Sequence, residues 1–391
     1  MQKKFKMALG MTAAAVMLAG MGAAQAQVKI GFITTLTGPG AALGVDQYDG
    51  FMLAVDKQGG KLGDVPVTVI KEDDQLKPDV GVQVAQKLLE KDKVDFVTGI
   101  IFSNVMMAVH KPIEDAKVFL IGSNAGPSPM SGASCSPYFF STSWNNDSLH
   151  EGGGKLATDM GYKNVYVMAP NYQAGKDAIN GFKRYYKGKI VDEVYTQVNQ
   201  PDYSVELAQL QSANPDAVYV FYPGGMGVNF VKQYRQAGLL GKLPLLSAST
   251  VDGSTLPALQ DIAVGVITNS PYSPDLDNPQ NKEFVKDFEK KYGRSPSMYA
   301  AQSYDAAMLM DSAIRKVKGN VKDKDALHAA LKAADFKSVR GPFSYNNNQF
   351  PIANFYRVDV VKGKDGKAEF ATKGIVFENH KDAYASQCPM K

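Results

Sequence analysis

The feature that most constrains the fold is a regular alternation of short apolar runs with helical patterns. Runs of five to eight residues, bounded by turn residues, predict buried strands at 28–34, 67–71, 94–101 and 118–122. Between two of these runs, Val80, Val84 and Leu88 share one face of a helix. Strands that alternate with helices predict βαβ units, and therefore a parallel sheet with helices on both faces.

The same alternation starts again after about residue 147. Ser148 and Glu151 have the spacing of a capping box that opens a helix. Apolar runs then predict strands at 164–168, 190–195, 217–222, 243–246 and 264–268, helices at 281–292 and 298–317, and a strand-rich part at 343–377. The chain therefore has an α/β fold with two doubly wound lobes.

Three breaks in composition, at 141–147, 270–277 and 345–349, indicate where the chain crosses between the lobes. A chain of 391 residues is also longer than one hydrophobic core usually serves. We predict that residues 27–145 and 275–345 form lobe 1. Residues 146–274 and 346–375 form lobe 2, and residues 376–391 form a C-terminal tail that returns to lobe 1.

The first residues have the three parts of a secretory signal peptide. Lys3, Lys4 and Lys6 precede an apolar run at 7–22, and Ala24-Gln25-Ala26 provides a cleavage site after Ala26. A membrane anchor fits less well, because the run is rich in Ala and Gly and shorter than the ~20 apolar residues of a span. No Cys stands at the cleavage site for a lipid anchor. We expect a soluble, exported, periplasmic protein.

Removing that peptide changes the charge balance. Three of the 43 basic residues and none of the 39 acidic residues lie in 1–26, so 40 basic residues remain and the net charge falls from +4 to +1. A nearly neutral protein has no electrostatic footprint for nucleic acid. Export also places Cys135 and Cys388, the only two cysteines, in an oxidising compartment. We expect a disulfide between them, with two free thiols as the alternative.

The sequence carries few signs of catalytic chemistry. No two of its four histidines have helical ligand spacing, so we expect no metal, and no G-x-S-x-G motif indicates a serine hydrolase. Gly38, Gly40 and Gly44 follow the first strand, but their spacing is one residue too long for a dinucleotide fingerprint. A turn that needs Gly is the ordinary explanation. We expect no cofactor and no enzymatic activity.

An ordered set of short segments resembles the leucine/isoleucine/valine-type periplasmic solute-binding proteins of ABC importers. It begins with Ile30-Gly31-Phe32 and Thr37-Gly38-Pro39 and spans essentially the whole chain after residue 26. Later segments of the set are Gly50-Phe51, Asp73-Asp74, 94–99, Phe102-Ser103, Asn171-Tyr172, 215–218 and Tyr304-Asp305-Ala306. The resemblance implies the type I periplasmic-binding-protein fold, in which two lobes joined by three crossover segments close over a small ligand.

Ligands of open α/β sheets bind at the carboxyl ends of the strands. By resemblance, Ser103 and the backbone around Asn124, Ala125 and Gly126 hold the carboxylate of the ligand, where a helix N-terminus is positive. A purely structural role for Ser103, as an N-cap, is the alternative. Aromatic side chains that could pack against a ring are Phe102, Trp144, Tyr172 and Tyr222.

Two departures from the amino-acid binders bear on the ligand. In the segment 172–175 the amino-acid binders carry an aromatic residue where this chain has Ala174. In the segment 247–250 they carry an acid that binds the ammonium of the ligand, and this chain has hydroxyl residues such as Ser249. Asp252, two residues beyond that segment, could substitute for the acid. The simplest interpretation is a carboxylate ligand without an ammonium. Benzoate-like, phenylacetate-like or hydroxycinnamate-like acids fit, and the aromatic-acid branch of the family is the nearest resemblance.

We therefore predict a monomeric binding protein that captures a small carboxylate, an aromatic acid, and delivers it to an ABC transporter permease. Two alternatives remain within this class: a branched-chain or other amino-acid binding protein, and a sensory module for a membrane receptor. An exported enzyme is a third alternative, against which the missing nucleophile–base pairs and metal ligands count.

Overall fold

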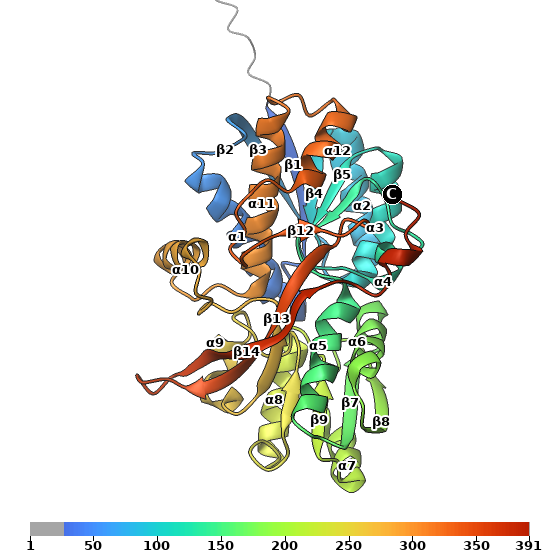
Figure 1. The fold of residues 1–391 in the computed structure, drawn as a ribbon, viewed down its shortest axis with the longest axis vertical. Helices are drawn as coiled ribbons and strands as arrows, with labels where there is room; N and C mark the ends of the chain where they lie inside the picture. The colour runs from blue at the N-terminus through green and yellow to red at the C-terminus, as the bar shows by residue number, and fades with distance from the viewer. Residues whose placement is uncertain (1–26, 391) are drawn as a thin grey trace, which may run out of the picture.

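The computed structural model describes residues 27–390, and the predicted signal peptide lies outside this range. The described chain forms two lobes stacked along the long axis of the molecule (Figure 1). Each lobe is built on its own sheet, so the predicted fold class is confirmed. Within 27–390, no helix combines the length and the apolar character needed to cross a bilayer.

Lobe 1 contains a six-stranded sheet in the order β2-β3-β1-β4-β5-β6, parallel except for the short β2–β3 pair. Side chains of β1 alternate between two cores: Ile30 and Phe32 lie in one, and Ile33 lies in the other. This two-sided burial explains the continuous apolar runs in the sequence. The strands are β1 (Val28–Thr34), β2 (Lys61–Leu62), β3 (Val65–Asp73), β4 (Phe96–Gly99), β5 (Phe119–Gly122) and β6 (Phe139–Ser141).

Helices cover both faces of this sheet. The core with Ile30 and Phe32 includes residues of α1 (Ala41–Lys57), α11 (Met298–Lys316) and α12 (Lys324–Ala333). Residues of α2 (Pro78–Gln86), its π-helical extension (Lys87–Asp92) and α3 (Ser103–Asp115) pack on the other face. The short elements η1 (Gly38–Gly40) and α4 (Ser128–Ser131) follow strand ends, and α10 (Pro279–Tyr292) lies beside α1.

Lobe 2 contains the second sheet, ordered β12-β13-β11-β10-β9-β7-β8, with β14 paired to β13. β7 to β11 are parallel, and β13 joins β11 in antiparallel sense. The long β13–β14 hairpin projects from the body of the lobe (Figure 1). The strands are β7 (Asn164–Pro170), β8 (Lys189–Thr196), β9 (Ala217–Val220), β10 (Leu245–Ser247), β11 (Ile267–Ser270), β12 (Ser344–Tyr345), β13 (Pro351–Lys362) and β14 (Ala368–His380).

The helices of lobe 2 include the one for which a capping box was predicted, and that prediction is wrong. The helix begins two residues earlier, at Asn146, and its N-cap is Asn145, whose side chain accepts a hydrogen bond from the Ser148 amide. Glu151 instead pairs with Arg184.

The helical elements of lobe 2 are α5 (Asn146–Asp159), α6 (Gln173–Tyr185), α7 (Ser204–Ala213), α8 (Gly225–Gln236), α9 (Leu256–Leu259) and η3 (Gln260–Ala263). The short helix η4 (Ala385–Gln387) follows β14 in the C-terminal tail.

The chain passes from the first sheet to the second after β6, leaves the second sheet after β11 and returns to it at β12. The composition breaks 141–147 and 270–277 coincide with the first two passages, and the break 345–349 lies just after the return, between β12 and β13. The buried guanidinium of Arg340 fixes the first passage: it pairs with Asp305 and donates to the carbonyls of Thr142 and Ser143. The predicted start of the tail at residue 376 falls inside β14, which continues to His380 because its pairing with β13 continues that far.

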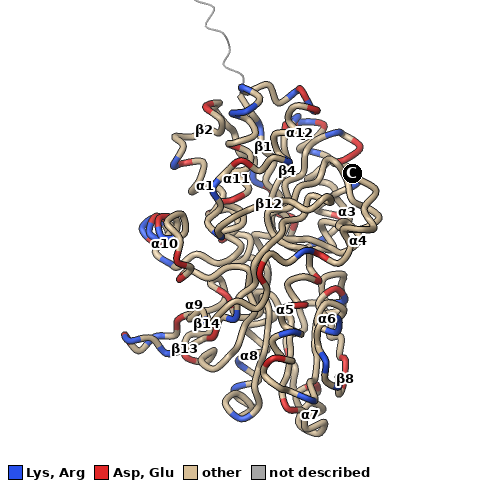
Figure 2. The backbone as a smooth tube through the Cα atoms, viewed as in Figure 1, with Lys and Arg blue, Asp and Glu red and all other residues tan. Residues whose placement is uncertain are grey.

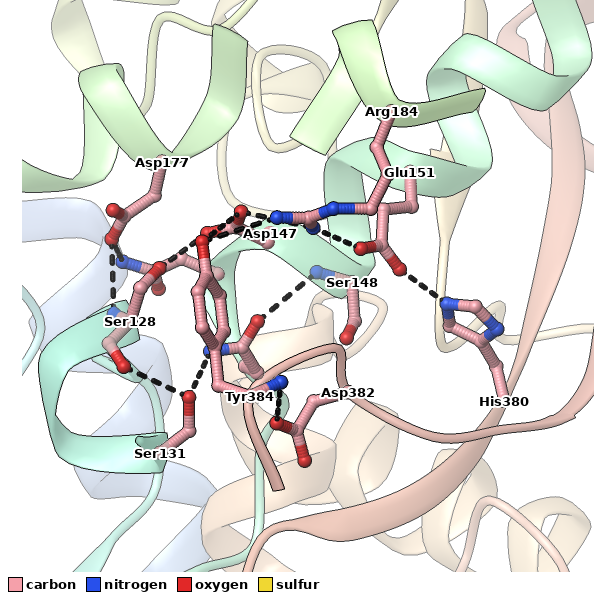
Figure 3. A network of polar contacts seen from close by, with 12 residues as sticks. Ser128, Ser131, Asp147, Ser148, Glu151, Asp177, Arg184, His380, Asp382 and Tyr384 are labelled. Atoms are coloured by element: carbon pink, nitrogen blue, oxygen red, sulfur yellow. Dashed lines mark hydrogen bonds and ion pairs between the residues drawn. The ribbon is translucent and has the colours of Figure 1, made fainter. Parts of the chain in front are cut away.

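A disulfide joins Cys388, beyond β14, to Cys135, in the loop that follows α4 of lobe 1. The alternative of two free thiols is therefore excluded in this structure. Polar contacts reinforce the return of the tail (Figure 3). The Tyr384 hydroxyl donates to Asp147 of α5 at 2.8 Å, and Asn348 donates both to Asp382 and to the carbonyl of Ser131 in lobe 1. The tail thus contacts both lobes.

Candidate functional site

A cavity lies where the carboxyl ends of strands from both sheets face each other. It encloses about 380 Å³ of space, including its opening. Lobe 1 contributes the loops after β4 and β5, and lobe 2 contributes the loops after β7, β9 and β10. The lining residues are Leu43, Ile101, Phe102, Ser103, Asn124, Ala125, Trp144, Asn146, Leu149, His150, Tyr172, Ala174, Phe221, Pro223, Ser249 and Tyr299.

The lobes touch across the entrance to this cavity. An added Cβ at Gly224, before α8, would lie 2.7 Å from both the Pro39 carbonyl oxygen and the Leu43 side chain. The ring of Phe102 in lobe 1 lies 6.3 Å from that of Tyr172 in lobe 2. These contacts describe a closed arrangement, in which only small residues allow the two edges to approach so closely.

Ser103 presents a hydroxyl to the cavity at the beginning of α3. It is the first residue of the helix; Phe102 occupies the N-cap position and makes no side-chain cap. The alternative role of Ser103 as N-cap is therefore not what the structure shows. The first amides of a helix have no partner within the helix, and here no side chain caps them. An anion beside Ser103 meets both a hydroxyl and the positive end of a thirteen-residue helix.

Asn146 orients the Ser103 hydroxyl. The Asn146 oxygen accepts from the Gly126 amide at 3.2 Å, so its nitrogen faces the other way and donates to Ser103 Oγ at 3.0 Å and to Asp177 at 2.9 Å. With its oxygen accepting from Asn146, the Ser103 hydroxyl has its proton left to donate. Residues from α3, α5 and α6 thus combine to make Ser103 a hydrogen-bond donor toward the cavity.

Two of the backbone amides predicted to bind the ligand, those of Ala125 and Gly126, have partners within the protein. The Ala125 amide donates to the carbonyl of Ile100 at 3.1 Å, and the Gly126 amide donates to Asn146. The Asn124 side chain bonds to Ile101 and Gln302. Asn124 and Ala125 still line the cavity. Gly126 does not line it; a Cβ added to Gly126 would lie 2.0 Å from the carbonyl oxygen of Trp144, so the backbone is tightly packed there.

Aromatic rings form much of the wall. The rings of Tyr172 and Phe221 are stacked, with centroids 6.3 Å apart and an interplanar angle of 19°. Phe221 also meets His150 edge-on at 4.8 Å. Phe102 and Trp144 complete this part of the lining. Burial raises the pKa of Tyr172 well above its usual value, so its hydroxyl remains protonated.

His150 is a neutral donor in this wall. Its Nδ1 lies 2.6 Å from the Tyr219 hydroxyl, which has no other described partner. If Nδ1 carried the proton, the buried Tyr219 hydroxyl hydrogen would lack an acceptor, so we assign the proton of the ring to Nε2. No described hydrogen bond uses Nε2. Complete burial lowers the pKa of His150 to about 3, so the ring is uncharged near neutral pH.

Eight of the ten predicted site residues line this one cavity: Phe102, Ser103, Asn124, Ala125, Trp144, Tyr172, Ala174 and Ser249. Tyr222 does not. Side chains alternate along β9 and its continuation, so Tyr219 and Phe221 face α5 and α6 while Tyr222 points to the other side. There Tyr222 packs on Tyr203 and Phe230 and bonds to Thr196. Its neighbour Phe221 lines the cavity instead.

Sequence reasoning missed eight lining residues: Leu43, Ile101, Asn146, Leu149, His150, Phe221, Pro223 and Tyr299. Phe221 lies near the end of the predicted strand 217–222 and Pro223 follows it, a position that the sequence does mark. Asn146, Leu149 and His150 lie in the first turns of the helix after the first crossing. No sequence signal distinguishes them, because their position depends on how the two lobes meet.

The cavity wall carries no ionised side chain. Charged residues of both signs occur along the chain in both lobes (Figure 2). Within residues 27–390, no group of three His, Cys, Asp or Glu residues is placed to hold a metal ion. The arrangement is a set of neutral donors between aromatic and aliphatic walls, without a nucleophile and base in contact.

Known proteins share this architecture. The sequence pattern of the family described as periplasmic binding protein matches residues 27–367. A "Leu/Ile/Val-binding protein homolog 6" of Brucella melitensis is 30% identical over 92% of this chain and 94% of its own. An ABC-transporter solute-binding protein of R. palustris, solved with benzoate, is 32% identical over 93% of this chain and 100% of its own, with a TM-score of 0.88.

A further structure is the solute-binding protein of an ABC transporter from Rhodopseudomonas palustris BisB5, solved with 3,4-dihydroxybenzoic acid. It is 31% identical, covers 91% of this chain and 99% of its own, and has a TM-score of 0.86. Both are named as solute-binding proteins, the class predicted for this chain. Its sequence, its two-lobed fold and its enclosed cavity together show that the chain belongs to the periplasmic binding protein family, among the solute-binding proteins of ABC transporters.

Proposed function

We propose that this protein binds an aromatic carboxylic acid in the periplasm and delivers it to an ABC transporter permease. The observation that carries the proposal is the donor set of the cavity, which combines Ser103 and His150 with aromatic walls and no ionised group. A carboxylate needs several donors and no neighbouring anion.

Ser103 is the proposed centre of carboxylate binding. Its hydroxyl proton is directed by Asn146, and the unpaired amides at the start of α3 add a favourable dipole. His150 Nε2 supplies a second neutral donor from lobe 2. Because the two donors belong to different lobes, a carboxylate that binds both favours the closed arrangement over the open one.

The rest of the cavity suits an aromatic ring. Phe102, Tyr172 and Phe221 offer flat surfaces, and Ala174 leaves room where a larger side chain would fill the space. An amino acid would bring an ammonium group, for which the lining holds no carboxylate. The similarity to a Leu/Ile/Val-binding protein homolog makes a branched-chain amino acid the competing ligand.

A thermal melting screen on the protein without residues 1–26 tests the proposal. Benzoate, 4-hydroxybenzoate, phenylacetate and 4-hydroxycinnamate are compared with leucine, isoleucine and valine. At a hundredfold excess over its Kd, a ligand adds ~2.7 kcal/mol to stability, which raises the Tm by several degrees. We expect at least one aromatic acid to do so. Stabilisation by a branched-chain amino acid alone would overturn the proposed ligand class.

A further inference from the structure

A second cavity adjoins the first behind Ser249. It contains about 350 Å³ of space not filled by atoms, its opening included, and lies between the loop after β10, the crossing after β11 and the start of α11. Ser249 lines both cavities. Asp252 and Tyr272 also line the second cavity, which we name the Asp252 cavity.

Three polar atoms of residues that line the Asp252 cavity have no hydrogen-bond partner. They are Asp252 Oδ2, the Tyr272 hydroxyl and Ser249 Oγ. Their residues are 8%, 3% and 5% exposed, so bulk water does not satisfy them. Leaving such groups unpaired costs free energy, most of all for a carboxylate. The cavity is therefore built for a polar group that the protein itself does not supply.

The chemistry of the three atoms indicates which group fits. The other oxygen of Asp252 already accepts from the amide and hydroxyl of Ser254, at 2.8 and 2.6 Å. Oδ2 needs a donor, while the hydroxyl protons of Ser249 and Tyr272 need an acceptor. A ligand hydroxyl can donate and accept at once. An ammonium only donates, so it would leave both hydroxyl protons unpaired.

Tyr299 connects the two cavities. Tyr299 lines the ligand cavity and lies near Ser249 and Asp252. A substituent that projects from a ligand ring toward Ser249 would approach the Asp252 cavity, because Ser249 lines both cavities. We propose that the Asp252 cavity is a subsite for a phenolic hydroxyl of the ligand, with Asp252 accepting its proton in a hydrogen bond and Ser249 or Tyr272 donating to its oxygen.

This inference rests on the proposed binding of aromatic acids. The test measures, by calorimetry, the Kd values of benzoate, 3-hydroxybenzoate, 4-hydroxybenzoate and 4-hydroxycinnamate for the wild type and for Asp252→Asn. The substitution keeps the oxygen that binds Ser254 and replaces the free oxygen with a donor. We expect one hydroxylated acid to bind at least tenfold more tightly than benzoate to the wild type, and this ratio to fall toward one in Asp252→Asn.

A matched control is Asp202→Asn. Asp202 makes the same type of turn with Ser204, bonding to its amide and hydroxyl, but on the surface before α7. The control is expected to keep the wild-type ratio. Tyr272→Phe removes only a hydroxyl and provides a second variant if Asp252→Asn does not fold; the ratio is expected to fall there as well.

Several results would overturn the inference. One is that no hydroxylated acid binds the wild type more tightly than benzoate. Another is that the ratio is the same in the wild type and in the folded variants. Binding of leucine that depends on Asp252 would identify an ammonium subsite instead. If no aromatic acid binds the wild type at all, the proposed function itself fails, which separates that outcome from failure of the subsite alone.

Discussion

At the scale of single residues, the hydrogen-bond donors of the cavity are set by the protons on Ser103 and His150. Asn146 leaves the Ser103 hydroxyl with a proton to donate, and Tyr219 leaves His150 with a proton on Nε2. Neither donor carries a charge. A neutral donor in a buried wall avoids the desolvation cost that an Arg or Lys would incur there, and it still binds a carboxylate strongly, because one partner of the hydrogen bond is ionised.

A pair of substitutions at His150 tests this assignment. The amide nitrogen of Gln reaches about as far as Nε2, whereas the shorter Asn reaches only the position of Nδ1, toward Tyr219. We expect His150→Asn to weaken binding of benzoate about tenfold, the equivalent of ~1.4 kcal/mol for a lost hydrogen bond to a charged group, and His150→Gln to weaken it less. Calorimetry provides the Kd values. Equal affinities in all three proteins would contradict the role of Nε2.

The pH dependence separates a neutral donor from a charged one. With the pKa of His150 lowered to about 3 by burial, the ring is neutral throughout pH 5–8. The affinity for benzoate is therefore expected to be flat across that range. A cationic His150 with an ordinary pKa would instead give tighter binding below pH 6.5. Titrations at pH 5, 6, 7 and 8 distinguish the two.

The same pKa shift affects stability. Between pH 6.5 and 3 the unfolded chain binds a proton at His150 and the folded chain does not. The contribution of the neutral ring to the free energy of unfolding is therefore fully present above pH 6.5 and is lost as the pH falls toward 3.

At the scale of elements, the start of α8 is where lobe 2 meets lobe 1. Gly224 has a positive φ of 63°, and both Gly224 and Gly225 lie against Pro39 of η1. An added Cβ at Gly225 would lie 3.1–3.2 Å from the Cβ, Cα and carbonyl oxygen of Pro39. A side chain at Gly225 would therefore push against Pro39 and strain the close approach of the two lobes.

Gly225→Ala is therefore expected to weaken ligand binding several-fold. It strains the closed state, while Ala in a helix is intrinsically better than Gly by ~0.5–1 kcal/mol. The ligand-free protein should then unfold in urea at the same or a slightly higher concentration. Gln236→Ala, at the exposed end of the same helix, is the control and should leave binding unchanged. Unaltered affinity in Gly225→Ala would show that closure does not need this contact.

At the scale of the whole molecule, the C-terminal tail adds a connection to the three crossings. It leaves β14 of lobe 2 and is bonded through Cys388 to Cys135 of lobe 1. Figure 3 shows Tyr384 beside Asp147 and His380 beside Glu151, both residues of α5. The bridge and these contacts connect the end of the chain to both lobes.

Replacing both cysteines tests the contribution of this bridge. In the chain-entropy model, a loop closed over 253 positions contributes on the order of 5 kcal/mol, which is an upper value for two folded lobes. We expect the Cys135→Ala, Cys388→Ala double variant to melt several degrees below the wild type, and the wild type in reductant to match it. An unchanged Tm in both would show that the tail contacts suffice.

The alternation of apolar runs and helical patterns determined the α/β class and the two lobes, because buried parallel strands and the helices between them leave local periodicities. Three breaks in composition indicated the three crossings. Strand ends also marked the loops around the cavity, so most of the predicted residues lie there. The pairing of the cysteines followed from their number and from export.

The tertiary structure decided what depends on contacts between distant segments. It placed Phe221 rather than Tyr222 in the wall, engaged the amides of Ala125 and Gly126 inside the protein, and brought His150, Asn146 and Tyr299 to the cavity. Asn146, His150 and Tyr299 have no local signal, since each is fixed by packing across the two lobes. The unpartnered oxygen of Asp252 is of the same kind: the sequence shows an acid near Ser249, and only the fold shows that one of its two oxygens is buried without a donor.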